Sequence, residues 1–290
     1  MTISNQRLRF AFFGTPEFAV IILDELEKAG FIPALVVTAP DKPKGRKLIV
    51  TPSEVKEWAS KRNIAVLTPE KIRGNGAFAQ ALKNTDCDLF IVAAYGKIIP
   101  KEILDIPRNG TLNVHPSLLP KFRGSSPVES AILSDDTHTG VTIMLLDEEM
   151  DHGPIVAQRE WRADNWPPKG SALTRDLAHA GGMLLAETIP GWMSGITAKP
   201  QDHAHATFTK KITKEDGLID LSADPLLNYK KIMAYDEWPG AYFFTEYNGK
   251  KIRVRITDAH LEEGTLVLDR VVPEGKKEMR YDDFLRGMQK

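Results

Sequence analysis

The sequence predicts an α/β fold, in which an open, mostly parallel sheet with helices on both faces is followed by a small C-terminal β-barrel. Short apolar runs alternate with amphipathic helical segments over most of the chain, which is the pattern of βαβ units. Towards the C-terminus, short segments of alternating polarity follow one another, as in small barrels. The 290 residues exceed one average domain of roughly 100 to 200 residues, so we expect two domains.

The elements of the N-terminal part follow from hydrophobic periodicity. Apolar or β-branched runs predict strands over residues 8–13, 33–38, 88–94, 110–114 and 140–146. Helical spacing or a helix-start signal predicts helices over residues 18–26, 52–61, 127–133 and 171–189. Gly14 permits a tight turn after the first strand, Ser53 caps the second helix, and Pro190 with Gly191 ends the last helix.

The C-terminal part is predicted to be mainly β. One helix is expected over residues 226–233, and strands are expected over residues 241–247, 251–258 and 265–272. Asn248-Gly249 is a strong hairpin signal between two of these strands. Residues 199–209 have no clear period and are interpreted as an extended linker. We therefore expect one domain over residues 1–204, with the linker near residues 195–204, and a second domain over residues 205–290.

The composition excludes several classes of protein. With 42% hydrophobic and 27% charged residues the chain is typical of globular proteins, and its formal net charge of −1 gives no general attraction to nucleic acid. The single cysteine, Cys87, cannot form an internal disulfide, and no apolar run approaches the roughly 18 residues of a membrane span. The first residues lack the pattern of a signal peptide. We expect a cytoplasmic monomer without a membrane partner.

A polar pair stands at the end of a predicted strand. Asn113 and His115 are two residues apart, so a strand places both side chains on one face. Sites in parallel sheets lie beyond the carboxyl ends of strands, where Asp151, which follows another predicted strand, could meet them. The three groups suit acyl transfer, with Asn113 donating to the oxyanion while Asp151 orients His115 and tunes its protonation. Taken alone, Asn113 and His115 also fit a strand that ends in two polar residues.

Two further motifs extend this pattern along the chain. Residues 13–18 read FGTPEF, and residues 147–154 read DEEMDHGP. With them, from residue 8 to the closing FLRG at 284–287, the sequence resembles the folate-dependent formyltransferases, and among these the enzymes that formylate methionyl-tRNA. The resemblance implies a Rossmann-like N-terminal domain that binds 10-formyltetrahydrofolate, and a C-terminal domain similar to an oligonucleotide-binding (OB) fold that helps to hold tRNA. It also implies the reaction, which is formylation of the amino group of initiator methionyl-tRNA for translation initiation.

The resemblance assigns residues to three sites. The family's catalytic Asn, His and Asp correspond to Asn113, His115 and Asp151. Its folate-binding residues correspond to Ser117, Leu118, Leu119 and Pro120, with Ala94, Tyr95, Gly96 and Asp147 framing the same pocket. The charge of the loop over residues 41–47 fits either a phosphate grip or a solvated loop, and in the family the corresponding loop enters the acceptor end of the tRNA. The expected tRNA contacts are Arg46, Lys42, Lys44, Lys47, Lys210 and Lys211.

Two departures from the family keep alternatives open. Glu149 stands where the family often has glycine, and the family's usual insertion between Asp258 and Gly264 is missing, which shortens the predicted barrel. A shortened second domain leaves room for another primary amine as acceptor, such as a nucleotide-linked amino sugar. Outside the enzymes, the alternative is a non-catalytic folate- or RNA-binding module. No metal is expected, since His203 and His205 lack companions to complete a set of about four ligands.

Overall fold

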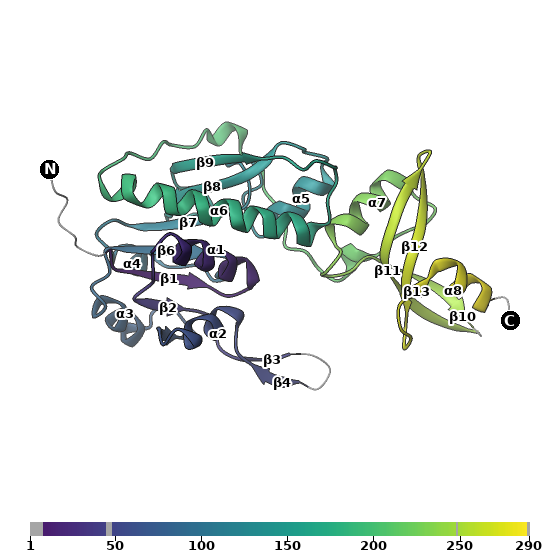
Figure 1. Ribbon diagram of the computed structural model, residues 1–290, viewed down its shortest axis with the longest axis horizontal. Helices are drawn as coiled ribbons and strands as arrows, with labels where there is room; N and C mark the ends of the chain where they lie inside the picture. Colours follow the sequence, from purple (N-terminus) through teal and green to yellow (C-terminus); the bar gives the residue numbers. More distant parts are fainter. Residues whose placement is uncertain (1–7, 45–47, 248, 289–290) are drawn as a thin grey trace. The chain divides into compact units, whose positions relative to one another are not determined.

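The computed structural model of the protein describes residues 8–44, 48–247 and 249–288 (Figure 1). These residues form two compact units, each assembled from separate stretches of the chain. The first unit takes the described chain up to Arg123 together with residues 140–161 and 175–208, and the second takes residues 124–139, 162–174 and the chain from Thr209. This partition follows contacts in space, so the domain boundary expected at residue 204 stays a prediction.

A seven-stranded sheet forms the centre of the first unit, in the order β5-β2-β1-β6-β7-β8-β9 (Figure 1). Its strands in chain order are β1 (Phe10–Gly14), β2 (Leu35–Val37), β5 (Ala65–Leu67), β6 (Leu89–Ala93), β7 (Thr111–His115), β8 (Thr139–Leu145) and β9 (Ile155–Trp161). The pairs β5–β2, β2–β1, β1–β6 and β6–β7 are parallel, which confirms the predicted mostly parallel sheet. Strand β8 is present as predicted, but it pairs with β7 in the antiparallel direction.

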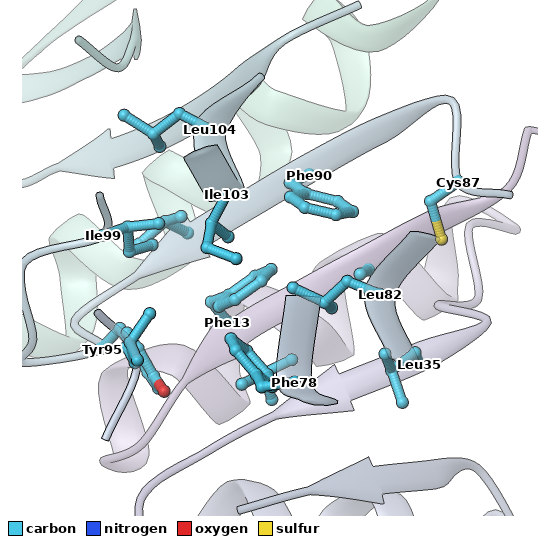
Figure 2. Packing of buried hydrophobic residues seen from close by; sticks show 14 residues of the cluster. Phe13, Leu35, Phe78, Leu82, Cys87, Phe90, Tyr95, Ile99, Ile103 and Leu104 are labelled. Carbon is cyan, nitrogen blue, oxygen red and sulfur yellow. The ribbon is translucent and has the colours of Figure 1, made fainter. Parts of the chain in front are cut away.

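Helices cover both faces of this sheet. They are α1 (Glu17–Lys28), α2 (Glu54–Lys61), α3 (Gly76–Lys83), α4 (Lys101–Leu104) and α6 (Gly170–Met193). Phe13 of β1 and Phe90 of β6 belong to a buried cluster with Phe78 of α3 and residues of α4, and full burial of each such ring contributes roughly 1.5–3 kcal/mol (Figure 2). On the opposite face α6 packs closely on β7, since a Cβ at Gly181 would lie 2.7 Å from Val114.

The predicted cap of α2 is confirmed. The hydroxyl oxygen of Ser53 accepts a hydrogen bond of 3.0 Å from the backbone N–H of Lys56, and it shares a second bond of 2.7 Å with the hydroxyl of Thr38 at the end of β2. Ser53 and Thr38 are both buried, so each hydroxyl needs the other as a partner. The cap thereby fixes the start of α2 against the sheet.

Pro190 and Gly14 do not have the local roles that the sequence predicted for them. Pro190 does not end α6, which continues to Met193. A proline in the last turn removes only one backbone donor, and the N–H of Ser194 still donates to the Pro190 carbonyl at 3.1 Å. Gly14 is the last residue of β1 and does not have a left-handed backbone. Its lack of a side chain is required by close packing instead, because a Cβ there would lie 2.6 Å from the Cβ of Ala19.

The second unit contains an antiparallel four-stranded sheet in the order β10-β11-β12-β13. Its elements are α5 (Pro127–Leu133), the short 3₁₀ helix η2 (Glu215–Gly217), α7 (Pro225–Ala234), β10 (Tyr242–Tyr247), β11 (Lys250–Glu262), β12 (Thr265–Pro273), β13 (Met279–Arg280) and α8 (Tyr281–Met288). The helix and three strands predicted for this part are present. Where a shortened barrel was expected, the described residues form this four-stranded sheet, with a core around Phe243, Val254 and Phe284. Of the predicted hairpin pair, Asn248 lies outside the described residues.

Candidate active site

Asn113 and His115 lie on one face of β7, as the alternation of a strand predicts. Asn113 is in register with Val92 of β6, which belongs to the cluster beneath α3 and α4, whereas the intervening Val114 contacts α6. The two polar side chains therefore occupy the α3–α4 face at the carboxyl end of β7, and they are only 8% and 5% exposed. Across the described stretches of the chain, the Asn113 amide has no hydrogen-bond partner, which leaves its donor for a bound group.

The imidazole of His115 is held through both ring nitrogens. Nε2 lies 3.0 Å from the carbonyl oxygen of Phe122, and Nδ1 lies 3.6 Å from Oδ1 of Asp151. Because a carbonyl oxygen can only accept, Nε2 carries a proton, and Nδ1 is the nitrogen on the side of the carboxylate. The structure thus brings Asp151 to His115, on the strand face that His115 shares with Asn113.

Asp151 reaches His115 by a route that differs from the predicted one. The prediction placed Asp151 beyond the carboxyl end of a strand parallel to β7. Strand β8 is antiparallel, so its last residue, Leu145, stands beside Leu112 near the start of β7. The loop of residues 146–154 then folds back, and the Leu145 N–H donates to the Pro154 carbonyl at 2.9 Å. The carboxylate arrives at the imidazole because this loop doubles back along the strand.

The turn that carries Asp151 has a left-handed backbone at Asp151 but not at Glu149. Asp151 adopts the left-handed conformation with φ 49°, whereas Glu149, the residue in place of the family's glycine, does not. A side chain at Glu149 is therefore accommodated without strain. The predicted pocket residue Asp147 holds the same loop together, because its carboxylate accepts from the Glu149 N–H at 3.0 Å and bonds the Nδ1 of His152 at 2.7 Å.

The predicted folate segment follows directly after His115. Ser117 and Leu119 are buried, and the Ser117 hydroxyl donates to the Lys121 carbonyl at 2.7 Å within the same turn. The Leu119 carbonyl accepts from the side-chain amide of Gln158 at 2.8 Å. These contacts fix the backbone, while Leu118 and Pro120 remain half-buried and accessible to a ligand.

The second predicted folate segment follows β6. Ala94 and Gly96 are exposed and both have left-handed backbones, with φ 46° and 77°. A Cβ built at Gly96 would meet no atom within 4 Å, so there is open space beside this backbone. The ring of Tyr95 points instead into the core, where it packs edge-on against Phe13 (Figure 2). Burial raises the pKa of its phenol to about 12, so Tyr95 supports the loop and does not offer a titrating group.

The predicted tRNA contacts lie on two separate parts of the chain. Lys42 is exposed on a hairpin formed by β3 (Lys42–Lys44) and β4 (Ile49–Thr51), and Arg46 and Lys47 lie outside the described residues. Lys44 is the last residue of β3. Lys210 and Lys211 are exposed in the second unit, and the Lys210 ammonium is paired with Asp216.

Two residues at the site were not predicted. Gln201, within the expected linker, and Arg123 are both buried and bond each other, and Gln201 also donates to the backbone of the Asp151 loop. Neither stands in a motif, and burial of a polar residue in a segment without periodicity cannot be read from the sequence. Their only signal is their spatial convergence on Asp151.

The described residues contain neither a cluster that could hold a metal ion nor a helix that could span a membrane. Among them, His, Cys, Asp and Glu side chains nowhere gather in threes with a geometry that would hold a metal ion. The helices that these residues form are likewise too short or too polar for any of them to cross a membrane.

Two family profiles match most of the chain. A profile described as "Formyl transferase" matches residues 8–189, and one described as "Formyl transferase, C-terminal domain" matches residues 211–265. The chain is 40% identical to the methionyl-tRNA formyltransferase of Roseiflexus castenholzii over 97% of its own length and 96% of the relative.

Among solved structures, the methionyl-tRNA formyltransferase from Clostridium thermocellum has a TM-score of 0.60 at 18% identity, covering 92% of this chain and 98% of that one. HypX from Aquifex aeolicus in complex with tetrahydrofolic acid has a TM-score of 0.66 at 17% identity, covering 98% and 48%. The likeness to these two structures is one of fold.

Proposed function

Because the chain belongs to the formyl transferase family, we propose that it takes the formyl group of 10-formyltetrahydrofolate and that Asn113, His115 and Asp151 carry out its transfer. The acceptor is the amino group of methionyl-tRNA, an activity supported by 40% identity along nearly the whole chain to a relative that has it. The product is formylmethionyl-tRNA for translation initiation, so we place the initiator tRNA as partner and the cytoplasm as location. We expect the enzyme to act as a monomer.

One observation carries the assignment of the site. The His115 ring is held between the Phe122 carbonyl at 3.0 Å and the Asp151 carboxylate at 3.6 Å, on the same strand face as the Asn113 amide. An amide donor, an imidazole and a carboxylate so arranged can serve an oxygen atom that gains negative charge. A strand that merely ended in two polar residues would not bring in the carboxylate.

The reaction needs no side-chain nucleophile. The lone pair of the acceptor's neutral amine attacks the formyl carbon, and the carbonyl electron pair moves onto oxygen. The Asn113 N–H donates to that oxygen, and the Nε2–H of His115 does so in exchange for its bond to the Phe122 carbonyl, while Asp151 orients the ring through Nδ1. When the carbonyl re-forms, the bond to the donor nitrogen breaks. The proton that the amine loses passes through water to Asp151 and from there to the released donor nitrogen, so the carboxylate is regenerated.

A folate donor fits the surroundings of the site. The exposed backbone at Ala94 and Gly96, with open space beside Gly96, can hydrogen-bond and stack against a flat ring system. The half-buried Leu118 and Pro120 add apolar surface. A neighbour in fold, HypX, has a structure with tetrahydrofolic acid. We propose these residues, with Asp147 bracing its loop, as the folate site, and we assign the 10-formyl form because the transferred group must arrive as a formyl.

The tRNA contacts are proposed on the hairpin β3–β4 and on the second unit. In the sequence, Lys42, Lys44, Arg46 and Lys47 give residues 42–47 a dense positive charge, and Ile49 on strand β4 is 61% exposed. Phosphate contacts make binding salt-dependent, with log Kd changing by roughly 0.7–0.9 per contact on a log-salt scale. The salt dependence of the Kd for tRNA is compared in two variants, one without the charges of residues 42–47 and one without Lys210 and Lys211. A weaker salt dependence in the first variant alone would support residues 42–47 as the main phosphate contacts.

The function is tested by offering two acceptors. The enzyme is incubated with 10-formyltetrahydrofolate and either methionyl initiator tRNA or a nucleotide-linked amino sugar, and release of tetrahydrofolate is followed. We expect release with methionyl-tRNA alone. Release with the amino sugar alone would favour the rival acceptor, and release with neither would leave a non-catalytic binding module. No specific observation on this chain favours either rival.

A further inference from the structure

We propose that the segment of residues 199–208 is a positioning element of the active site, because it restrains two polar groups that contact the His115 ring. The segment lies outside the two family profiles, which match residues 8–189 and 211–265. It contains the short 3₁₀ helix η1 (His203–His205) and was expected to be a linker. The inference rests on the proposed roles of His115 and Asp151.

Gln201 holds the Asp151 side of the ring. Its side-chain amide donates to the carbonyl of Asp151 at 2.9 Å and to the carbonyl of Gly153 at 2.7 Å. Gln201 is 5% exposed, so these bonds are made away from water and cannot be replaced by solvent without opening the structure. The two bonds span the residue between Asp151 and Gly153 and so clamp the turn that presents the carboxylate.

Arg123 fixes the clamp from behind. Its guanidinium donates to the side-chain oxygen of Gln201 through Nε at 3.1 Å and through a terminal nitrogen at 2.7 Å, and that terminal nitrogen also lies 2.8 Å from Nδ1 of His203. Arg123 is 3% exposed. Because the oxygen of Gln201 is engaged with Arg123, its amide nitrogen must face the Asp151 loop, and the orientation of the amide is set.

Thr207 holds the opposite side of the ring. Its hydroxyl accepts from the backbone N–H of Phe122 at 2.8 Å, and its carbonyl accepts from the N–H of Arg123 at 2.9 Å. Phe122 provides the carbonyl that lies 3.0 Å from His115 Nε2. The position of this carbonyl is therefore set from the same segment that sets Asp151.

Backbone strain indicates that this clamping is required. Phe122 and Asp151, whose oxygen atoms lie next to the His115 ring nitrogens, both adopt the left-handed conformation, with φ 59° and 49°. Such a backbone is uncommon for a bulky residue such as phenylalanine and costs of order 1–3 kcal/mol unless its surroundings impose it. Thr207 restrains one of these residues and Gln201 the other. The segment thus keeps the imidazole aligned with its carboxylate and with the reacting oxygen.

The test separates positioning from folding. Gln201→Glu keeps an acceptor for Arg123 but replaces the donor to the Asp151 and Gly153 carbonyls by a second acceptor. We expect kcat for methionyl-tRNA to fall on the order of 10²-fold with KM changed less than about threefold, and the thermal midpoint to fall modestly because two buried hydrogen bonds are lost. Thr207→Val, which removes only an exposed hydroxyl, should lower kcat by roughly tenfold on the same grounds. His205→Ala, in the same segment but exposed and bonded only to Asp202, is the matched control and should behave as wild type.

The outcomes are distinguishable. Wild-type kcat in both Gln201→Glu and Thr207→Val, in folded protein, would overturn the inference while leaving the proposed function intact. If Gln201→Glu lowered the thermal midpoint strongly, the kcat of Thr207→Val would be the deciding measurement. A wild-type kcat in Thr207→Val would then refute the positioning role of the segment. Failure of the wild-type enzyme to formylate methionyl-tRNA would instead refute the proposed function.

Discussion

Gly153 has no room for a side chain, so Gly153→Ala should displace the loop that carries Asp151. An added Cβ would lie 1.9 Å from the carbonyl oxygen of Leu145 and 3.1 Å from its carbonyl carbon. Both are rigid backbone atoms, so Gly153→Ala must push the loop away by at least about 1 Å to relieve the clash, and by about 1.5 Å before ordinary van der Waals contact is restored. Gly153 is two residues from Asp151 and shares the Gln201 clamp with it. The carboxylate should therefore be displaced from His115.

A displacement of about 1 Å costs on the order of 10²-fold in rate, and overpacking at such a site costs about 1–3 kcal/mol of stability. Steady-state formylation of methionyl-tRNA should accordingly show kcat reduced by roughly 10²-fold, and urea denaturation should show the loss of stability. Gly76→Ala is the matched control, because a Cβ at that first residue of α3 meets nothing within 4 Å. It should leave kcat unchanged. A normal kcat in Gly153→Ala would mean that this loop does not place the catalytic carboxylate.

Three further changes test the fold around the site. Ser53→Ala should cost about 1 kcal/mol or more in urea denaturation, because it removes the cap of α2 and leaves the Thr38 hydroxyl buried without its partner; an unchanged midpoint would show that the cap is dispensable. Phe90→Ala should destabilise by about 3–5 kcal/mol, since its ring is fully buried beside Phe13; a loss below about 1 kcal/mol would show that the cluster repacks. Hydrogen bonds from the guanidinium of Arg62 hold the pKa of Glu27 below its usual value. The Glu27 carboxylate therefore stabilises the fold fully at pH values above the unfolded pKa of about 4.3. This contribution is lost as the pH falls through the lower folded pKa. Glu27→Gln should flatten the fall in thermal midpoint below about pH 4, and an acid limb as steep as that of wild type would contradict this assignment.

Periodicity was sufficient to predict the main elements of the sheet and the residues of β7. Alternation along that strand placed Asn113 and His115 on one face, because the side-chain period of a strand does not depend on its neighbours. Strand direction does depend on neighbours. The apolar run of β8 gives no sign that it pairs antiparallel with β7, so the predicted path to Asp151 was wrong even though the contact was present.

The clamp could not have been predicted from sequence. A glutamine in a segment without periodicity, such as Gln201, is normally exposed, and nothing local indicates that it meets Arg123 and the Asp151 loop far away in the chain. The extension of α6 past Pro190 was missed because a proline signals a helix end statistically, whereas here it removes only one donor in the last turn.

The claim that Asn113 and His115 stabilise the oxygen as it gains charge is tested most directly by the single-turnover rate of formyl transfer from 10-formyltetrahydrofolate to methionyl-tRNA in Asn113→Ala. Removal of one oxyanion donor should slow transfer by about 10²–10³-fold, equal to roughly 2.7–4 kcal/mol, while the thermal midpoint and tRNA affinity stay near those of wild type. A transfer rate within about threefold of wild type would remove Asn113 from the chemistry and contradict the proposed mechanism.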